Sequence, residues 1–90
     1  SGSGSEIDFV IETQKRRPDA IAHIVCIEVK VAKKWDRKWE RPMRFLSKDP
    51  RIHVAKMMGV YMGERTYHFD GIDVLPLNVF LDQLHRGKIF

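Results

Sequence analysis

Hydrophobic and polar residues alternate over residues 6–12 and 21–31, and this period of two predicts a pair of β-strands. The second stretch is rich in β-branched residues and is apolar on both faces until Glu28, as a central strand is. Between them, the polar segment 13–20 with its Pro18 is expected to form a hairpin connection. The apolar positions on one face of the first strand are Ile7, Phe9 and Ile11.

A short helix is expected after the two strands. Pro42 can open it, because proline is favoured at the first helical position, and it would run through about Lys48. Its apolar residues are Met43, Phe45 and Leu46. A third strand is expected over residues 52–62.

The last third of the chain predicts a hairpin and a helix. Residues 66–69 and 72–75 flank Asp70-Gly71, a pair typical of a tight hairpin turn. Pro76 then starts the final helix, and Gly87 is its expected C-terminal stop. The apolar stripe of this helix consists of Leu77, Phe80, Leu81 and Leu84.

This order of elements predicts an α+β domain in which a mixed sheet is flanked by helices. Ninety residues suffice for one small domain. Residues 1–5 alternate serine and glycine and are interpreted as a linker or tag remnant, which leaves residues 6–90 as the folded domain.

Charge is unevenly distributed along the chain. The net charge is +4, but residues 15–51 hold twelve basic and five acidic side chains and the remainder is net acidic. A basic region on a small domain attracts phosphate backbones, which makes DNA a candidate partner. The simpler interpretation is a solvated face. The side chains expected to contact a nucleic-acid backbone are Lys33, Lys34, Arg37 and Lys38.

Asp8, Glu28 and Lys30 lie near the ends of the first two apolar strands. Carboxylates are costly to bury unless they are paired or hold a cation. If the strands form a hairpin, the side chains of Asp8 and Glu28 can meet across the sheet, and Lys30 points to the face of Glu28. Mg²⁺ prefers oxygen ligands, so the two carboxylates make a candidate site for Mg²⁺ or Mn²⁺, at which a bound water can be activated.

The same three residues also have a structural interpretation. Lys30 can neutralise the carboxylates in an ordinary ion pair, and the spacing of Asp8, Glu28 and Lys30 is common by chance. Their position at the end of a strongly apolar strand favours a site, because charge there needs an explanation. The residues alone leave both interpretations open.

The segment Glu6-Ile7-Asp8-Phe9-Val10, followed by Ile27-Glu28-Val29-Lys30, resembles the PD-(D/E)xK nuclease superfamily, also called restriction-endonuclease-like. More closely, the chain is similar to the C-terminal domain of uncharacterised bacterial and archaeal AAA-type ATPases. In that group an E-[VI]-D-F strand precedes an I-E-[VI]-K strand, and a segment like residues 71–77 leads into the last helix. The resemblance runs from Glu6 to Phe90.

The resemblance implies a role for each matching residue. Asp8 and Glu28 would be metal ligands, joined by the backbone carbonyl of Val29. Lys30 would position the attacking water or stabilise the charge of the phosphorane. The implied reaction is Mg²⁺-dependent hydrolysis of DNA phosphodiesters, carried out within a larger ATPase. Glu6, on the strand face of Asp8, would be a supporting acid or a surface residue.

The chain departs from the nuclease pattern at its start. The nuclease core usually begins with a helix and a strand before the Asp strand, and residues 1–5 stand where they would be. An alternative function is therefore a non-catalytic protein-interaction or DNA-docking domain that retains the nuclease fold and contacts its own ATPase domain. An edge strand left unpaired would also promote self-association.

The remaining candidates are weaker. Cys26 is the only cysteine, and its apolar neighbours predict a buried thiol in a reducing cytoplasm. Trp35 and Trp39 could stack on bases, but such residues more often cover a core. The four histidines lack the spacing of zinc ligands. No apolar run approaches the roughly 20 residues that span a bilayer, so no membrane contact is expected.

Overall fold

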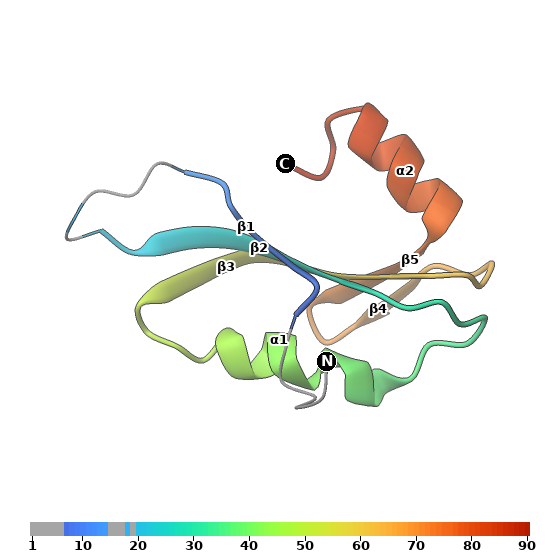
Figure 1. Cartoon of the computed structure of the whole chain (residues 1–90), viewed down its shortest axis with the longest axis horizontal. Coiled ribbons are helices and arrows are strands. Elements are labelled where there is room, and N and C mark those ends of the chain that lie inside the picture. The colour runs from blue at the N-terminus through green and yellow to red at the C-terminus, as the bar shows by residue number, and fades with distance from the viewer. Residues whose placement is uncertain (1–6, 15–17, 19) are drawn as a thin grey trace.

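The structure, a computed structural model of the 90-residue chain, describes residues 7–14, 18 and 20–90. In this part of the chain, five strands form one mixed sheet in the order β1-β2-β3-β5-β4 (Figure 1). The elements are β1 (Phe9–Glu12), β2 (Ala22–Val29), the 3₁₀ helix η1 (Arg37–Glu40), α1 (Arg41–Leu46), β3 (Ile52–Tyr61), β4 (Tyr67–Phe69), β5 (Ile72–Pro76) and α2 (Leu77–His85). The predicted α+β class, with a mixed sheet flanked by helices, is confirmed.

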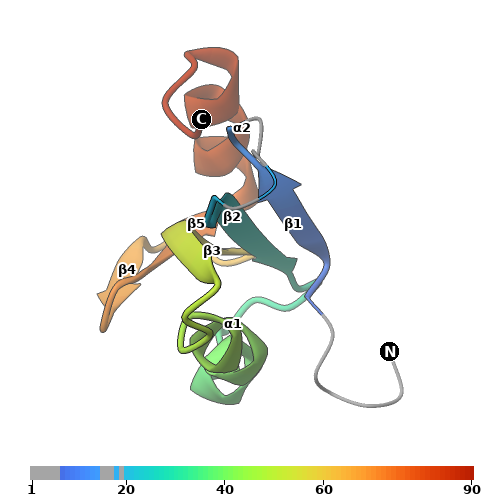
Figure 2. The same cartoon turned by 90° about the vertical axis from the view of Figure 1, so that its left-hand side faces the viewer.

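The connections explain why the sheet is mixed. β1 pairs antiparallel with β2, whereas β2 pairs parallel with β3, and β3 pairs parallel with β5. A parallel pair needs a crossover connection, and the segment that carries η1 and α1 supplies the one between β2 and β3. The two α-helices lie on opposite faces of the sheet (Figure 2). The sheet is therefore buried on both sides at its centre.

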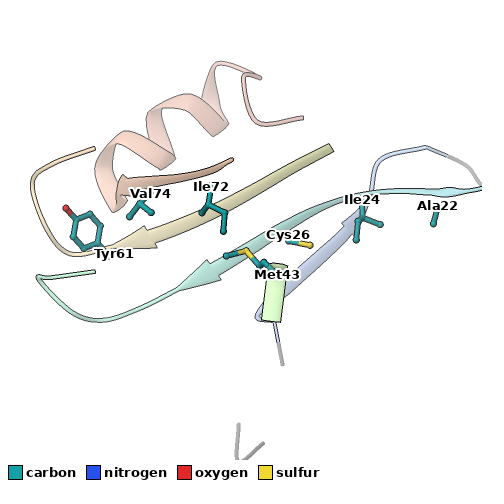
Figure 3. Packing of buried hydrophobic residues seen from close by; sticks show 7 residues of the cluster. All are labelled: Ala22, Ile24, Cys26, Met43, Tyr61, Ile72 and Val74. Atoms are coloured by element: carbon teal, nitrogen blue, oxygen red, sulfur yellow. The ribbon is translucent and has the colours of Figure 1, made fainter. Parts of the chain in front are cut away.

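The α1 side of the sheet holds one buried cluster, seen in Figure 3. It consists of Ala22, Ile24, Cys26, Met43, Tyr61, Ile72 and Val74. Cys26 is fully buried, and burial raises the pKa of its thiol to about 11. A thiol with so high a pKa is protonated at neutral pH and chemically inert, so Cys26 is a core residue as predicted.

The α2 side holds a second buried cluster, made of Val25, Ile27, Met58, Val60, Leu75 and Ile89. Val79 and Phe80 of α2 pack against it. The segment after α2 returns to the sheet, where the ammonium of Lys56 donates hydrogen bonds to the carbonyl oxygens of Lys88 and Ile89 at 2.8 and 2.9 Å. These bonds hold the C-terminal residues over this face.

A bulge in the β2–β3 pairing sets which residues of β3 face each cluster. Ile24 lies opposite Val54, but the next residue, Val25, lies opposite Lys56, so one residue of β3 is left over. Because successive residues of a strand alternate between faces, the extra residue reverses the alternation. Val54 and Met57 consequently both pack against the α1-side cluster.

The two predicted chain reversals at glycine are confirmed. Asp70 and Gly71 have φ of 48° and 87°, the positive pair that a type I′ turn between β4 and β5 requires. Gly87 has φ of 70° and closes α2: its amide donates to the carbonyl of Leu84, and that of Lys88 donates to Gln83. This pair of bonds is the Schellman motif.

Three details of the predicted faces are wrong. The chain bends at Asp8, so that Ile7 packs on the α1 side while Ile11 packs on the α2 side. α1 ends at Leu46, and Phe45 is 81% exposed because the buried side of this short helix is formed by Met43 and Leu46. Leu81 of α2 is half exposed, although it was predicted to lie in the apolar stripe.

The main contacts of α2 are with β5 and β3, and its apolar stripe is only partly buried. An apolar groove of about 240 Å³ lies between α2 and the β1–β2 pair. It is lined by Phe9, Ile11, Ile27, Val29, Phe80, Leu84 and Phe90.

The expected self-association stays a prediction. None of the helices within the described residues has the length and apolar content needed to cross a bilayer.

Candidate functional site

The pairing of β1 with β2 brings Asp8 and Glu28 together. Phe9 lies opposite Ile27, and the same register, continued by one residue, sets Asp8 opposite Glu28. The amide of Asp8 donates to Glu28 Oε1 at 3.1 Å, and the amide of Val29 donates to Asp8 Oδ2 at 2.8 Å. The predicted antiparallel pairing of the two strands is confirmed, although residues 15–17 and 19 of the connection lie outside the described residues. The contacts of Asp8 and Glu28 run through backbone amides, and a direct meeting of the two carboxyl groups stays a prediction.

Lys30 lies on the same side as Glu28, as the alternation of β2 predicts. Its Nζ is 3.2 Å from Glu28 Oε2 and 5.4 Å from the centre of the Trp39 ring. The Glu28 side chain is 7% exposed and that of Lys30 is 32% exposed. Glu28 is thus nearly buried, with a single half-exposed cation beside it, and the ring of Trp39 supports that cation through a cation–π contact.

The oxygen donors at this site suit a hard divalent cation. An ionised carboxylate has about four lone-pair positions, so the bonds already described leave both Asp8 and Glu28 with acceptor capacity. Mg²⁺ is commonly held by one or two carboxylates together with water and substrate phosphate. Among the described residues, no group of three or more His, Cys, Asp or Glu side chains is arranged to hold a metal ion. A cation here would therefore rely on Asp8, Glu28, backbone oxygen and solvent.

Glu6 lies outside the described residues, and Val29 contributes its amide to Asp8. The backbone carbonyl of Val29 remains the predicted third ligand. The arrangement of two carboxylates and a lysine at the end of β2 can orient a phosphate and a water, which is the chemistry of metal-assisted phosphodiester hydrolysis.

The four predicted backbone-contacting residues are in different environments. Lys33 and Lys34 are exposed. Lys38 lies 3.6 Å from Asp36, a distance typical of a loose surface ion pair. Arg37, in contrast, donates to Asp70 at 2.7 Å and also contacts Glu40. Lys33 and Lys34 are therefore better placed than Arg37 to contact a nucleic-acid backbone.

Glu40 is a second buried carboxylate, 1% exposed, that was not predicted from the sequence. It accepts hydrogen bonds from Trp35 Nε1 at 2.9 Å and Arg44 Nη2 at 2.8 Å, and Arg37 contacts it at 3.3 Å. Arg44 also donates to the backbone carbonyls of Phe69 and Asp70, at 2.7 and 2.8 Å. Through Arg44, Glu40 thereby connects the η1–α1 segment to the β4–β5 turn.

The hydrogen bonds to Glu40 decide its charge. Burial alone would raise the pKa of this carboxyl, but the hydrogen bonds from Arg44, Trp35 and Arg37 outweigh that effect and hold the pKa below its ordinary value. Arg37 has a raised pKa, because of its hydrogen bonds to Asp70 and then to Glu40. The i, i+4 spacing of Glu40 and Arg44 was the signal available in the sequence.

Trp35 belongs to this buried network, and Trp39 lies between Trp35 and Lys30. Trp35 packs against the α1-side cluster, and its ring lies so close to Gly59 of β3 that an added Cβ would be 2.4 Å from it. Trp35 and Trp39 contact each other edge to face, with ring centres 5.1 Å apart. The prediction that Trp35 packs rather than stacks on bases agrees with this placement.

The geometry defines the protein as an α+β domain with two carboxylates and a lysine at one end of its β1–β2 pair. Residues 1–80 match the model of a family described as "Domain of unknown function (DUF4143)". The match covers most of the chain, which therefore belongs to the DUF4143 family. Searches of curated proteins and of solved structures found no match to the chain.

Proposed function

We propose that this chain is the nuclease-like domain of a larger ATPase, a member of the PD-(D/E)xK superfamily that hydrolyses DNA phosphodiesters with Mg²⁺ or Mn²⁺. The observation that carries the proposal is the convergence of Asp8, Glu28 and Lys30 at one end of the β1–β2 pair. A nearly buried glutamate beside a second carboxylate and a lysine is an unusual use of charge in so small a domain.

Each residue has a separate task in this proposal. Asp8 and Glu28, with the backbone carbonyl of Val29, would hold the cation. The cation supplies Lewis acidity and lowers the pKa of water at the site. Lys30, at 3.2 Å from Glu28, can hold the water or phosphate oxygen in line for attack and offset developing negative charge. Trp39 limits the motion of the lysine ammonium by lying beneath it.

DNA is the proposed substrate because the basic residues follow the candidate site in sequence. Lys33 and Lys34 are exposed three and four residues after Lys30. Phosphate contacts by lysine release counterions, so binding through them should weaken steeply as salt concentration rises. Salt-independent binding would contradict this part of the proposal.

A cleavage assay tests the proposal. Labelled DNA, single-stranded and duplex, is incubated with the wild-type chain, Asp8→Asn and Lys30→Met, in Mg²⁺, Mn²⁺ and a chelator. The proposal predicts metal-dependent cleavage by the wild type and loss of at least about 10²-fold in each variant. Lys48→Met is the matched control, because this exposed lysine lies at the opposite end of β3. Equal cleavage by Asp8→Asn and the wild type would reject the proposal.

One observation favours a second candidate, a non-catalytic DNA-docking domain with the same fold. Glu28 and Lys30 already form a direct ion pair, which is how a structural interpretation explains both charges. This candidate predicts salt-dependent DNA binding that neither Asp8→Asn nor a chelator changes, and no cleavage under any metal condition.

A further inference from the structure

A polar cavity lies beyond the candidate site, at the C-terminal ends of β2 and β3. It has a volume of about 350 Å³, which is within the range of small-molecule sites, roughly 300–1,000 Å³. Its lining consists of Lys33, Tyr61, Met62, Gly63, Glu64, Arg65 and Tyr67. Ligand sites in sheets with parallel strands favour this edge, outside the carboxyl ends of the strands.

The cavity is held in shape by its own loop. The hydroxyl of Tyr61 donates a hydrogen bond to the backbone carbonyl of Arg65 at 2.6 Å, which closes the turn over residues 62–65. Gly63 lies against the Tyr61 ring so closely that a Cβ would be 2.2 Å from the ring carbon Cε2. Only glycine permits this approach, and the resulting turn sets the position of the Arg65 backbone. A site formed before its ligand arrives loses less entropy on binding.

Charge and aromatic surface meet in this cavity. Lys33 and Arg65 contribute two exposed cations against the single carboxylate of Glu64. Tyr67 is half-buried and stacks on Phe69, with ring centres 5.2 Å apart and an interplanar angle of 18°. The ring of Tyr61 also lies near Tyr67, with ring centres 6.4 Å apart. Contacts with both neighbouring rings hold Tyr67 in place as a platform for a further planar group. A cation can bind the phosphate of a nucleotide while a neighbouring tyrosine ring stacks on its base.

The β2–β3 pairing continues from the candidate site to this cavity. Beyond the strands, the amide of Lys30 donates to the Val60 carbonyl, and the amide of Met62 donates to the Ala32 carbonyl, each at 2.8 Å. Lys33 follows Glu28 by five residues, which would span at most about 17 Å in a fully extended chain, and the chain bends at Lys33. The carboxylate cluster and the cavity therefore lie along one edge, within reach of a single short strand of nucleic acid.

We propose that this cavity binds one nucleotide of a single-stranded nucleic acid, with Lys33 and Arg65 on its phosphate and Tyr67 on its base. The inference rests on the proposed function, since it supplies that site with a substrate class. A base inside a duplex is stacked and paired, so only a splayed-out base can enter such a cavity. The substrate is accordingly a single strand or a frayed end.

The test is a binding measurement without metal. Fluorescence anisotropy with a 5′-labelled thymidine tetranucleotide, in low salt and a chelator, gives Kd for the wild type, Lys33→Gln, Arg65→Gln and Tyr67→Leu. Leucine keeps the bulk of the half-buried ring but removes its stacking face. Each variant is expected to bind about fivefold or more weakly than the wild type. Lys48→Gln, the matched exposed lysine at the other end of β3, should leave Kd unchanged.

Two competitors separate the possible ligands. Thymidine monophosphate should displace the tetranucleotide at a lower concentration than inorganic phosphate does, yet bind more weakly than the tetranucleotide. Equal competition by phosphate would overturn the role of the base, and a mononucleotide that binds as tightly as the strand would overturn the role of the strand. No binding by the wild type, or equal weakening by Lys48→Gln, would reject the cavity altogether.

The result can be read independently of the cleavage assay. Binding that depends on Arg65 and Tyr67, together with no cleavage in Mg²⁺ or Mn²⁺, would reject the catalytic proposal and leave the nucleotide cavity standing. Cleavage lost in Asp8→Asn but binding unaffected by the cavity variants would reject only this inference.

Discussion

Two buried glutamates on the same face of the sheet differ in how their charge is met. Glu40 is 1% exposed and is surrounded by two guanidinium groups and an indole N–H. Among the described residues, the Glu28 carboxylate, 5% exposed, meets the ammonium of Lys30 and the backbone amide of Asp8. Glu40 thus has two cationic partners in this part of the chain, whereas Glu28 has one. From this comparison we infer that Glu40 stabilises the fold and that Glu28 is the candidate for metal binding.

The largest effect is expected from removing the charge of Glu40. Glu40→Gln leaves Arg44 and Arg37 facing an uncharged amide inside the network, and breaking a buried ion pair in this way typically costs about 3–5 kcal/mol. Urea denaturation measures the loss. Glu64→Gln, an exposed glutamate, is the control and should be neutral. A Glu40→Gln variant as stable as the wild type would remove the contrast between the two residues.

The acid dependence of stability should follow Glu40. Its pKa in the folded state is below the ordinary value of 4.5, because hydrogen bonds from the arginines and Trp35 outweigh burial. Such a group contributes stability that is fully present above the unfolded-state pKa and is lost as pH falls through the folded-state pKa. The free energy of unfolding should therefore decline below pH 4.5, and part of this slope should be missing in Glu40→Gln. An identical acid slope in the variant would contradict the assignment.

The same change at Glu28 should cost much less. Glutamine at this position keeps an oxygen that can accept from the Asp8 amide, and Lys30 is exposed enough for water to replace the lost ion pair. We expect Glu28→Gln to lower stability by about 1 kcal/mol or less. A loss equal to that of Glu40→Gln in the same urea titration would mean that Glu28 is mainly structural.

The smallest effect is expected at the outer edge of the Glu40 network. Asp70 pairs with Arg37 at 2.7 Å, but its side chain is 74% exposed. Water screens such a pair, so Asp70→Asn should leave the urea midpoint indistinguishable from the wild type. Asparagine also tolerates the positive φ of this turn position. A marked loss of stability would extend the structural network to the surface.

The sequence was sufficient for the order of elements and for the carboxylate pair. Strand alternation and the predicted hairpin connection indicate that Asp8 lies opposite Glu28. The two-residue spacing indicates that Lys30 lies on the same face as Glu28. The turn at Asp70-Gly71 and the stop at Gly87 were equally accessible, because positive φ has a strong residue signature.

Features that depend on tertiary packing were not accessible. The alternation of residues 52–62 does not indicate the β3 bulge. The sequence therefore could not predict that Val54 and Met57 lie on the same side of the sheet. The burial of Glu40 depends on Arg44 reaching carbonyls some 25 residues away in sequence. The cavity at Arg65 depends on a contact between Gly63 and the Tyr61 ring, which no periodic pattern in the sequence predicts.

The most direct test of the candidate site is a Mg²⁺ and Mn²⁺ titration of the isotope-labelled chain followed by NMR. The account predicts chemical-shift changes with Mg²⁺ and line broadening with Mn²⁺, centred on Asp8, Glu28 and Lys30 and absent in Asp8→Asn. That variant keeps an oxygen for the Val29 amide, so the local fold should persist. No localised change at millimolar metal, or equal change in Asp8→Asn, would contradict the metal site.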